Sequence, residues 1–372
     1  MKRRSGLSRS VLLAGAVIVL LVVIAGVFGF ALSGSKQSST SAKSSTSTSS
    51  GTPPPTNSAG TSTATVSLTG YNLSQPIGMA YDPANGDIYV TNNFTNTVSA
   101  INVASRSLVA TIKVGLAPAA AIFDPANKYL YVTNNDSDSV SVIDGVSNSV
   151  AKTIALGGIH PDGITLDTAN DCLYVAEHGN SGGSNGVAVI NATSNSYLRE
   201  IGTNNYPTGV AYDSSNGDVY VTTSASNVVV IDTVTNEITQ QIGVGNRPSG
   251  IAFDSTNGNI YVANTVSGTV SVIAGSSNTA VATVNVSTSV LSAPYLVAFD
   301  PANGYILVSN TYSSGIDVID GSTNSVIKLV STGFQSAPAG LALDSDNGNL
   351  YVAGHASDSI TSITSTLTAS PF

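Results

Sequence analysis

The sequence predicts an all-β protein, a seven-bladed β-propeller of four-stranded blades, and three observations support this prediction. One unit recurs seven times at intervals of 41 to 46 residues, a spacing typical of propeller blades. The helix-favouring residues Lys, Glu, Arg and Met are scarce, and only 9% of the chain is charged. Val, Ile, Thr, Ser and Asn are abundant beside 35 Gly and 14 Pro, which is typical of short strands joined by tight turns.

Each unit begins with a proline, and its first half has a fixed length. An Asp follows six residues after the proline, an Asn nine residues after it and a Val fourteen residues after it. The prolines are Pro76, Pro118, Pro161, Pro207, Pro248, Pro294 and Pro338. The aspartates are Asp82, Asp124, Asp167, Asp213, Asp254, Asp300 and Asp344. Because Asp and Asn stabilise turns through their side chains, we expect these aspartates to be structural and not catalytic.

Four short strands are predicted in each unit. In the fifth unit they cover residues 250–253, 260–263, 269–273 and 280–284. The inner strands are almost wholly apolar, as expected of blades packed on both faces, whereas the outermost strands are more polar. A tyrosine precedes the repeated Val in six units, with Leu307 as the exception.

The two ends of the repeat region predict how the ring closes. The seventh unit has three strands and ends near Thr364, so it lacks a fourth. Residues 64–69 resemble 110–114, a fourth strand of the first unit. We therefore expect the N-terminal strand to complete the last blade and leave no open sheet edge.

The N-terminal part of the chain predicts a single-pass membrane anchor. Residues 1–10 are basic, 11–32 contain no charge, and 33–63 are rich in Ser, Thr and Pro. Such a run is long enough to span a bilayer, and the preceding positive charges place the N-terminus in the cytoplasm. The prediction is a cytoplasmic tail (1–10), a transmembrane anchor (11–32), a disordered stalk (33–63) and an extracellular propeller (64–372).

Two other readings of this end remain open. The apolar run is also compatible with a cleaved secretory signal, although such signals are usually shorter. In addition, residues 4–8, which read RSGLS, resemble the type IV pilin-like signals of archaeal surface proteins. That resemblance implies cleavage after Gly6 with the apolar segment retained.

The repeats carry a family resemblance. Residues 89–93 and 131–135 both read YVTNN, and the repeats resemble the YVTN-type β-propeller family of surface-layer and secreted proteins. The resemblance covers residues 64–364, with departures at 176–177, 222–223 and 353–354. It implies an extracytoplasmic propeller used for adhesion or protein contact, and it assigns no catalytic residue.

Charge and cysteine content exclude some classes of protein. The formal net charge is −9, which argues against a nucleic-acid partner because nucleic-acid binding needs a basic face. Cys172 is the single cysteine, so an intramolecular disulfide is impossible. No nucleotide-binding or hydrolase motif occurs, and we expect no cofactor.

The third unit departs most from the repeat and contains the candidate ligand-binding residues. The loop after its second strand is lengthened around 181–185, and His160, Asp162, Glu177 and His178 flank the same end of the unit. His355 occupies the position of His178 in the seventh unit. These side chains have the chemistry to bind a divalent metal or to act as acid and base, or they are simply solvated; no metal ligand or catalytic residue is assigned. The loop at 286–293 is a second irregular place on the same face.

Five sequons are glycosylation candidates. They are Asn72, Asn93, Asn135, Asn191 and Asn285.

The expected function is a membrane-anchored cell-surface module that binds a protein or glycan without catalysis, for adhesion or within the envelope. The alternative is a secreted propeller enzyme, lactonase- or dehydrogenase-like, with a metal at the ligand-binding end of the ring. A purely structural role in the cell envelope is a third reading. The sequence does not identify the partner or the oligomeric state.

Overall fold

The structure is a computed structural model, and it describes residues 65–68, 70–179, 185–286, 293–333 and 336–364. The predicted tail, membrane anchor and stalk lie outside these residues. Within the described part of the chain, no helix is both long and apolar enough to cross a membrane.

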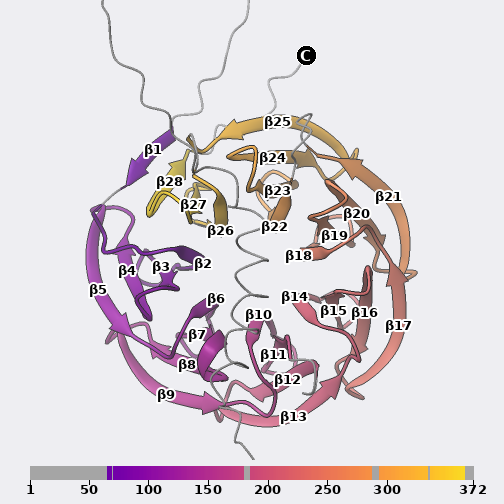
Figure 1. The fold of residues 1–372 in the computed structure, drawn as a ribbon, viewed down its shortest axis with the longest axis horizontal. Helices are drawn as coiled ribbons and strands as arrows, with labels where there is room; N and C mark the ends of the chain where they lie inside the picture. The colour runs from indigo at the N-terminus through magenta and orange to yellow at the C-terminus, as the bar shows by residue number, and fades with distance from the viewer. Residues whose placement is uncertain (1–64, 69, 180–184, 287–292, 334–335, 365–372) are drawn as a thin grey trace, which may run out of the picture. The chain divides into compact units, whose positions relative to one another are not determined.

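Seven four-stranded antiparallel sheets form a ring around a central axis (Figure 1). This confirms the prediction of an all-β seven-bladed propeller. In each blade the first strand lies nearest the axis and the fourth lies at the rim (Figure 1).

The strands keep the same limits from blade to blade. The first strands are β2 (Pro76–Asp82), β6 (Pro118–Asp124), β10 (Pro161–Asp167), β14 (Pro207–Asp213), β18 (Pro248–Asp254), β22 (Pro294–Asp300) and β26 (Pro338–Leu343). The second strands are β3 (Asp87–Asn92), β7 (Tyr129–Asn134), β11 (Cys172–Glu177), β15 (Asp218–Thr223), β19 (Asn259–Asn264), β23 (Tyr305–Asn310) and β27 (Leu350–Gly354). The third strands are β4 (Thr97–Asn102), β8 (Ser139–Asp144), β12 (Gly186–Asn191), β16 (Asn227–Asp232), β20 (Thr269–Ala274), β24 (Gly315–Asp320) and β28 (Ser359–Ile363). The fourth strands are β5 (Ser107–Lys113), β9 (Ser149–Ala155), β13 (Ser196–Gly202), β17 (Glu237–Gly243), β21 (Thr279–Asn285), β25 (Ser325–Ser331) and β1 (Thr65–Leu68). A short 3₁₀ helix, η1 (Asn135–Ser137), follows β7.

The seventh blade is closed by the N-terminal strand, as the sequence predicts. Strand β1 pairs antiparallel with β28, so that Thr65 lies opposite Ile363 and Leu68 opposite Ile360. The ring is thereby closed by backbone hydrogen bonds between the two ends of the propeller, and β28 is no longer an exposed sheet edge.

The repeated aspartates are structural, as expected. All seven are buried, and in each the side chain accepts a hydrogen bond from the backbone N–H two residues later, at 2.8–3.0 Å. This bond fixes the tight turn that joins the first and second strands of every blade.

The repeated tyrosines connect neighbouring blades. Tyr131 is fully buried, and its hydroxyl donates a hydrogen bond to Asn195 in the turn between the third and fourth strands of the next blade, at 2.8 Å. The same bond joins Tyr89 to Asn148, Tyr174 to Asn236, Tyr220 to Asn278 and Tyr261 to Asn324. Each acceptor Asn has a φ of 50–56°, in the left-handed region that Asn tolerates better than most residues.

Leu307 is an exception for a structural reason. The blade that follows it is the seventh, whose fourth strand β1 is not joined to β28 by a turn. No turn Asn is present there to accept a hydroxyl hydrogen bond. Leu307 instead packs in an apolar cluster with Leu350, Val352 and Ile363 of the seventh blade.

Candidate functional site

One face of the ring, here called the loop face, is made by the loops that precede each first strand and the loops that follow each second strand. A backbone hydrogen bond joins these two loops in all seven blades, at 2.9–3.4 Å. Its donor is the residue directly after the second strand, and its acceptor is the carbonyl of the residue before the proline. Because the bond uses only backbone atoms, the side chains at both positions are free to vary between blades.

The third blade brings two of the predicted residues together at this bond. The N–H of His178 donates to the carbonyl of His160 at 3.0 Å. The backbone of His160 has a φ of 56°, and its N–H donates to the carboxylate of Asp138 at 2.9 Å. Ring atom Nδ1 of His160 lies 3.1 Å from the carbonyl oxygen of Asn135, so both its backbone and its ring are held by the second blade.

The ring of His178 contacts a tyrosine ring of the fourth blade. The centroids of the His178 and Tyr206 rings are 5.0 Å apart, and their planes are inclined by 32°. Burial lowers the pKa of His178, and the positive charges of His160 and Arg247 lower it further. The neutral imidazole is therefore favoured at neutral pH.

Glu177 is the last residue of β11, directly before His178, and is fully buried. Its Oε1 accepts a hydrogen bond from the N–H of Gly158 at 3.0 Å, whereas Oε2 has no hydrogen-bond partner. Burial raises the pKa of Glu177 to about 7, with a further contribution from the negative charge of Glu200. Four other blades have Asn at this position, so the third blade replaces a neutral amide with a titratable acid.

Asp162 is the second residue of β10 and is partly buried. Its carbonyl accepts a hydrogen bond from the hydroxyl of Thr133 at 2.8 Å. Burial raises the pKa of Tyr295 in β22, three blades away; the negative charge of Asp162 raises it further, and Arg247 acts on the same phenol in the opposite sense. The three side chains therefore lie within electrostatic range of one another across the axis of the ring.

His355 is not near the other candidates, because it lies in the seventh blade. Its N–H donates to the carbonyl of Ala337 at 3.2 Å. The ring is buried, which lowers its pKa, and the backbone of Pro76 and Gln75 in the first blade opposes this shift. The side chain thus contacts the junction at which the ring closes.

Sequence reasoning did not identify Tyr206, Arg247 and Tyr295. A signal was present, because each of them directly precedes or follows the proline of its unit. We name the resulting set the polar arc: His160, Asp162, His178, Tyr206, Arg247 and Tyr295. It extends over blades three to six, whereas the residues that flank the proline are Ala in the second and seventh blades.

Among the described residues, no three His, Cys, Asp or Glu side chains are grouped so as to hold a metal ion.

The glycosylation candidates differ in how their side chains are used. Asn72 and Asn285 are exposed. The amide nitrogens of Asn93 and Asn135 donate to the carbonyls of Pro118 and Pro161 in the next blade, at 3.4 and 3.2 Å. Asn191 accepts two hydrogen bonds from Ser194 within a turn.

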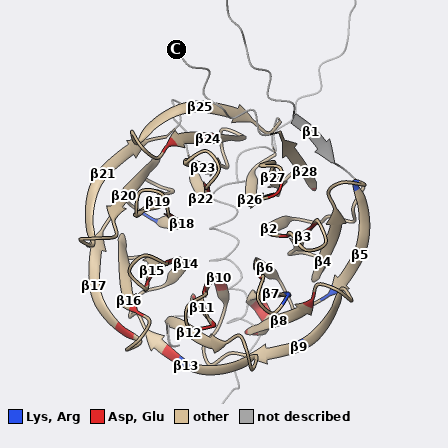
Figure 2. Ribbon diagram, turned by 180° about the vertical axis from the view of Figure 1, so that it is seen from behind, with Lys and Arg blue, Asp and Glu red and all other residues tan. Residues whose placement is uncertain are grey.

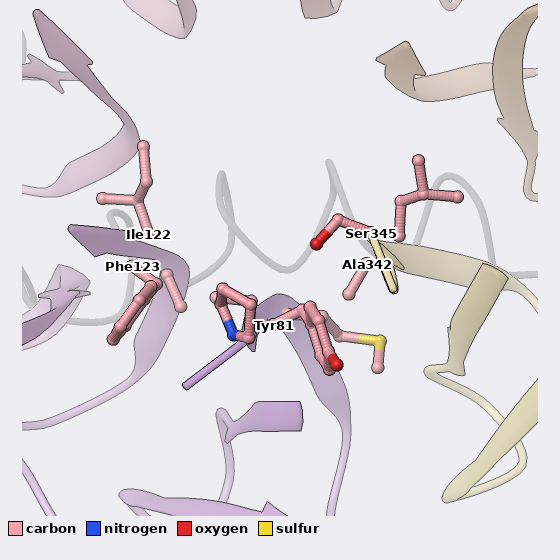
Figure 3. A pocket seen from close by; sticks show the side chains of 10 residues that line it. Tyr81, Ile122, Phe123, Ala342 and Ser345 are labelled. Carbon is pink, nitrogen blue, oxygen red and sulfur yellow. The ribbon is translucent and has the colours of Figure 1, made fainter. Parts of the chain in front are cut away.

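A separate cavity of about 310 Å³ lies between the inner strands β26, β2 and β6 (Figure 3). It is lined mainly by apolar side chains, including Met79, Ile122 and Phe123. The hydroxyl of Tyr81, also in its wall, donates to Asp346 at 2.9 Å.

Charged residues are sparse around the whole ring (Figure 2).

Comparison with known proteins identifies the fold. No family model matches the chain, and no curated protein matches it. Among solved structures it is similar to hydrazine synthase of Kuenenia stuttgartiensis, with a TM-score of 0.71 and 20% identity over 80% of this chain and 97% of that chain. It is also similar to a streptogramin B lyase, with a TM-score of 0.68 and 14% identity over 81% of this chain and 97% of that chain. At these identities the similarity shows a shared propeller fold.

Proposed function

We propose that the chain is a membrane-anchored cell-surface propeller that binds a protein or glycan partner on its loop face and is not an enzyme. The uneven distribution of side chains around the ring supports this proposal. The backbone hydrogen bond that builds the loop face recurs in every blade, so the fold does not require the polar arc. Irregular polar and aromatic side chains on one face of a regular scaffold are typical of binding sites.

The proposal is tested by capture experiments with the full chain. Glycan arrays and pull-downs from cell envelopes would be compared for the parent, a His178→Ala/Tyr206→Ala variant and a Lys152→Ala control on the rim strand β9. We expect the double variant to lose roughly tenfold or more in affinity, a range usual for central contacts, and the control to bind normally. Equal binding by all three would contradict a site at the polar arc, and recovery of the chain in the soluble cell fraction would contradict the anchor.

The enzyme alternative has its own supporting observation. Glu177 has a pKa of about 7 and lies beside His178, as expected of a general acid or base. Mass spectrometry of the full chain, purified without a histidine tag, would measure its metal content. One stoichiometric metal that is lost in His178→Ala would favour an enzyme over a binding module.

A further inference from the structure

The polar arc differs from the rest of the chain in its positive charge. Besides Arg247, the described residues include six Lys or Arg: Arg106, Lys113, Lys128, Lys152, Arg199 and Lys328. All of these lie in rim strands or in the turns that join strands, and none is adjacent to a proline that begins an innermost strand. Arg247 is therefore the cationic side chain that the described chain places beside the axis on this face.

The backbone around Arg247 is held on both sides. Its carbonyl accepts a hydrogen bond from Thr265 at 3.0 Å, and the carbonyl of Asn246 accepts one from Val266 at 3.2 Å. The side chain itself is exposed. Within the described residues no ion pair to Arg247 is formed, so its guanidinium retains its capacity to bind an anion. Guanidinium groups bind carboxylates through two parallel hydrogen bonds.

Next to this cation lies a pair of aromatic rings. The centroids of the His178 and Tyr206 rings are 5.0 Å apart and their planes are inclined by 32°, and Arg247 is close enough to lower the pKa of His178. Aromatic faces provide rigid contact area for the apolar side of a ligand at low cost in conformational entropy.

The polar arc also offers groups that suit hydroxyls. The Asp162 carboxylate is an acceptor, and the Tyr295 phenol is both donor and acceptor. Asp162 and Tyr295 are the second residues of the innermost strands β10 and β22, and Arg247 directly precedes the innermost strand β18, so all three lie at the loop-face ends of the strands nearest the axis (Figure 1). A ligand that satisfies this set has a carboxylate at one end, several hydroxyls and an apolar ring face.

We propose that the polar arc binds an acidic sugar, a hexuronate unit of a glycan, with its carboxylate on Arg247, its ring face against His178 and Tyr206, and its hydroxyls toward Asp162 and Tyr295. This inference rests on the proposed binding function and specifies its ligand. A neutral sugar would leave the Arg247 guanidinium without its counter-charge. A simple inorganic anion would not use the aromatic pair or Asp162.

The test is calorimetric titration of the full chain with a panel of hexuronate oligosaccharides and with their methyl esters, which have the same shape without the charge. The variants are Arg247→Met and a matched control, Arg199→Met, in the rim strand β13. We expect binding of at least one acid form, weaker binding of its ester, and a loss of roughly 10- to 100-fold with Arg247→Met, with no change in Arg199→Met. Raising the salt concentration should weaken binding of the acid.

Several outcomes would overturn the proposal. Equal affinity for acid and ester, unchanged binding by Arg247→Met, or no binding of any hexuronate would each exclude an acidic sugar at this site. The more general binding function would still be judged by whether the His178→Ala/Tyr206→Ala variant loses its captured partner. A protein captured through the polar arc would thus support the binding module while contradicting the acidic sugar.

Discussion

At the scale of single residues, Glu177 shows how one substitution within a repeat creates a titratable group. Asn92 in the first blade occupies the same position, where its Oδ1 accepts a hydrogen bond from Ser74 and its amide nitrogen donates to Ser99. Glu177 keeps a bond of the first kind, because its Oε1 accepts a hydrogen bond from the backbone N–H of Gly158. The third blade has Ala188 where the first has Ser99, so no hydroxyl is present at that position to donate to the carboxylate, and Oε2 of Glu177 has no hydrogen-bond partner.

This burial predicts a pH dependence of stability. The pKa of Glu177 rises from 4.5 to about 7, so the folded chain holds this proton more tightly than the unfolded chain. The free energy of unfolding should therefore fall as pH rises from 4.5 to 7, by at most about 3 kcal/mol. Glu177→Gln should remove this dependence and stabilise the chain above pH 7, as measured by chemical unfolding at several pH values. Glu237→Gln, at an exposed site in β17, serves as the control. If the free energy of unfolding of the parent and of Glu177→Gln depended on pH in the same way, Glu177 would not be the group responsible for the dependence.

At the scale of elements, the contacts between blades depend on side chains from the second strands. The hydroxyl of Tyr131 donates to Asn195 and accepts from Asn127, at 2.8 and 2.9 Å. Apolar packing also joins the blades, as in the cluster that connects Tyr131 to Leu173 and Val175. The tyrosine thus contributes to the apolar core and adds a directional bond to the next blade.

A double-mutant cycle measures this bond. Tyr131→Phe alone should cost about 1–3 kcal/mol of unfolding free energy, because it leaves buried polar groups unpaired. Combined with Asn195→Ala, it should show a coupling energy of about 1 kcal/mol. Combined with Asn236→Ala, which removes the partner of Tyr174 in another blade, it should be additive. Additivity in both pairs would show that the hydroxyl makes no bridge.

The sequence allowed the elements to be predicted well and the site only in part. The fixed spacing of Pro, Asp, Asn and Val is visible in the chain because each residue performs the same local task in every blade. The fifth-unit strands were predicted too short, by up to three residues, since β18 begins at Pro248 and ends at Asp254. Tyr206, Arg247 and Tyr295 were missed because the pattern of one unit does not reveal which positions of the other blades lie near it on the loop face.

At the scale of the whole molecule, β1 determines whether the propeller is a closed ring. Without it, the buried side chains of Ile360 and Ile363 in β28 would lie on an open edge. Such an edge exposes unpaired backbone groups and favours association with other chains.

Removal of this strand gives a clear prediction. A variant that begins at Gly70 should unfold at a temperature several degrees lower than one that begins at Thr61, which retains β1, because one outer strand and its pairing are lost. Sedimentation should also show the shorter variant self-associating through β28. A monomer with an unchanged unfolding midpoint would mean that β1 contributes little to closure.

The closing strand also has a mechanical consequence. The chain enters the ring through β1, whose only sheet partner is β28. If the segment before β1 is fixed to a cell and a partner is pulled from the loop face, the load passes into the ring through the pairing of four residues with β28. These backbone bonds would be loaded before the hairpins of the other six blades, so the force that a bound partner can sustain would be limited by the shortest strand in the propeller.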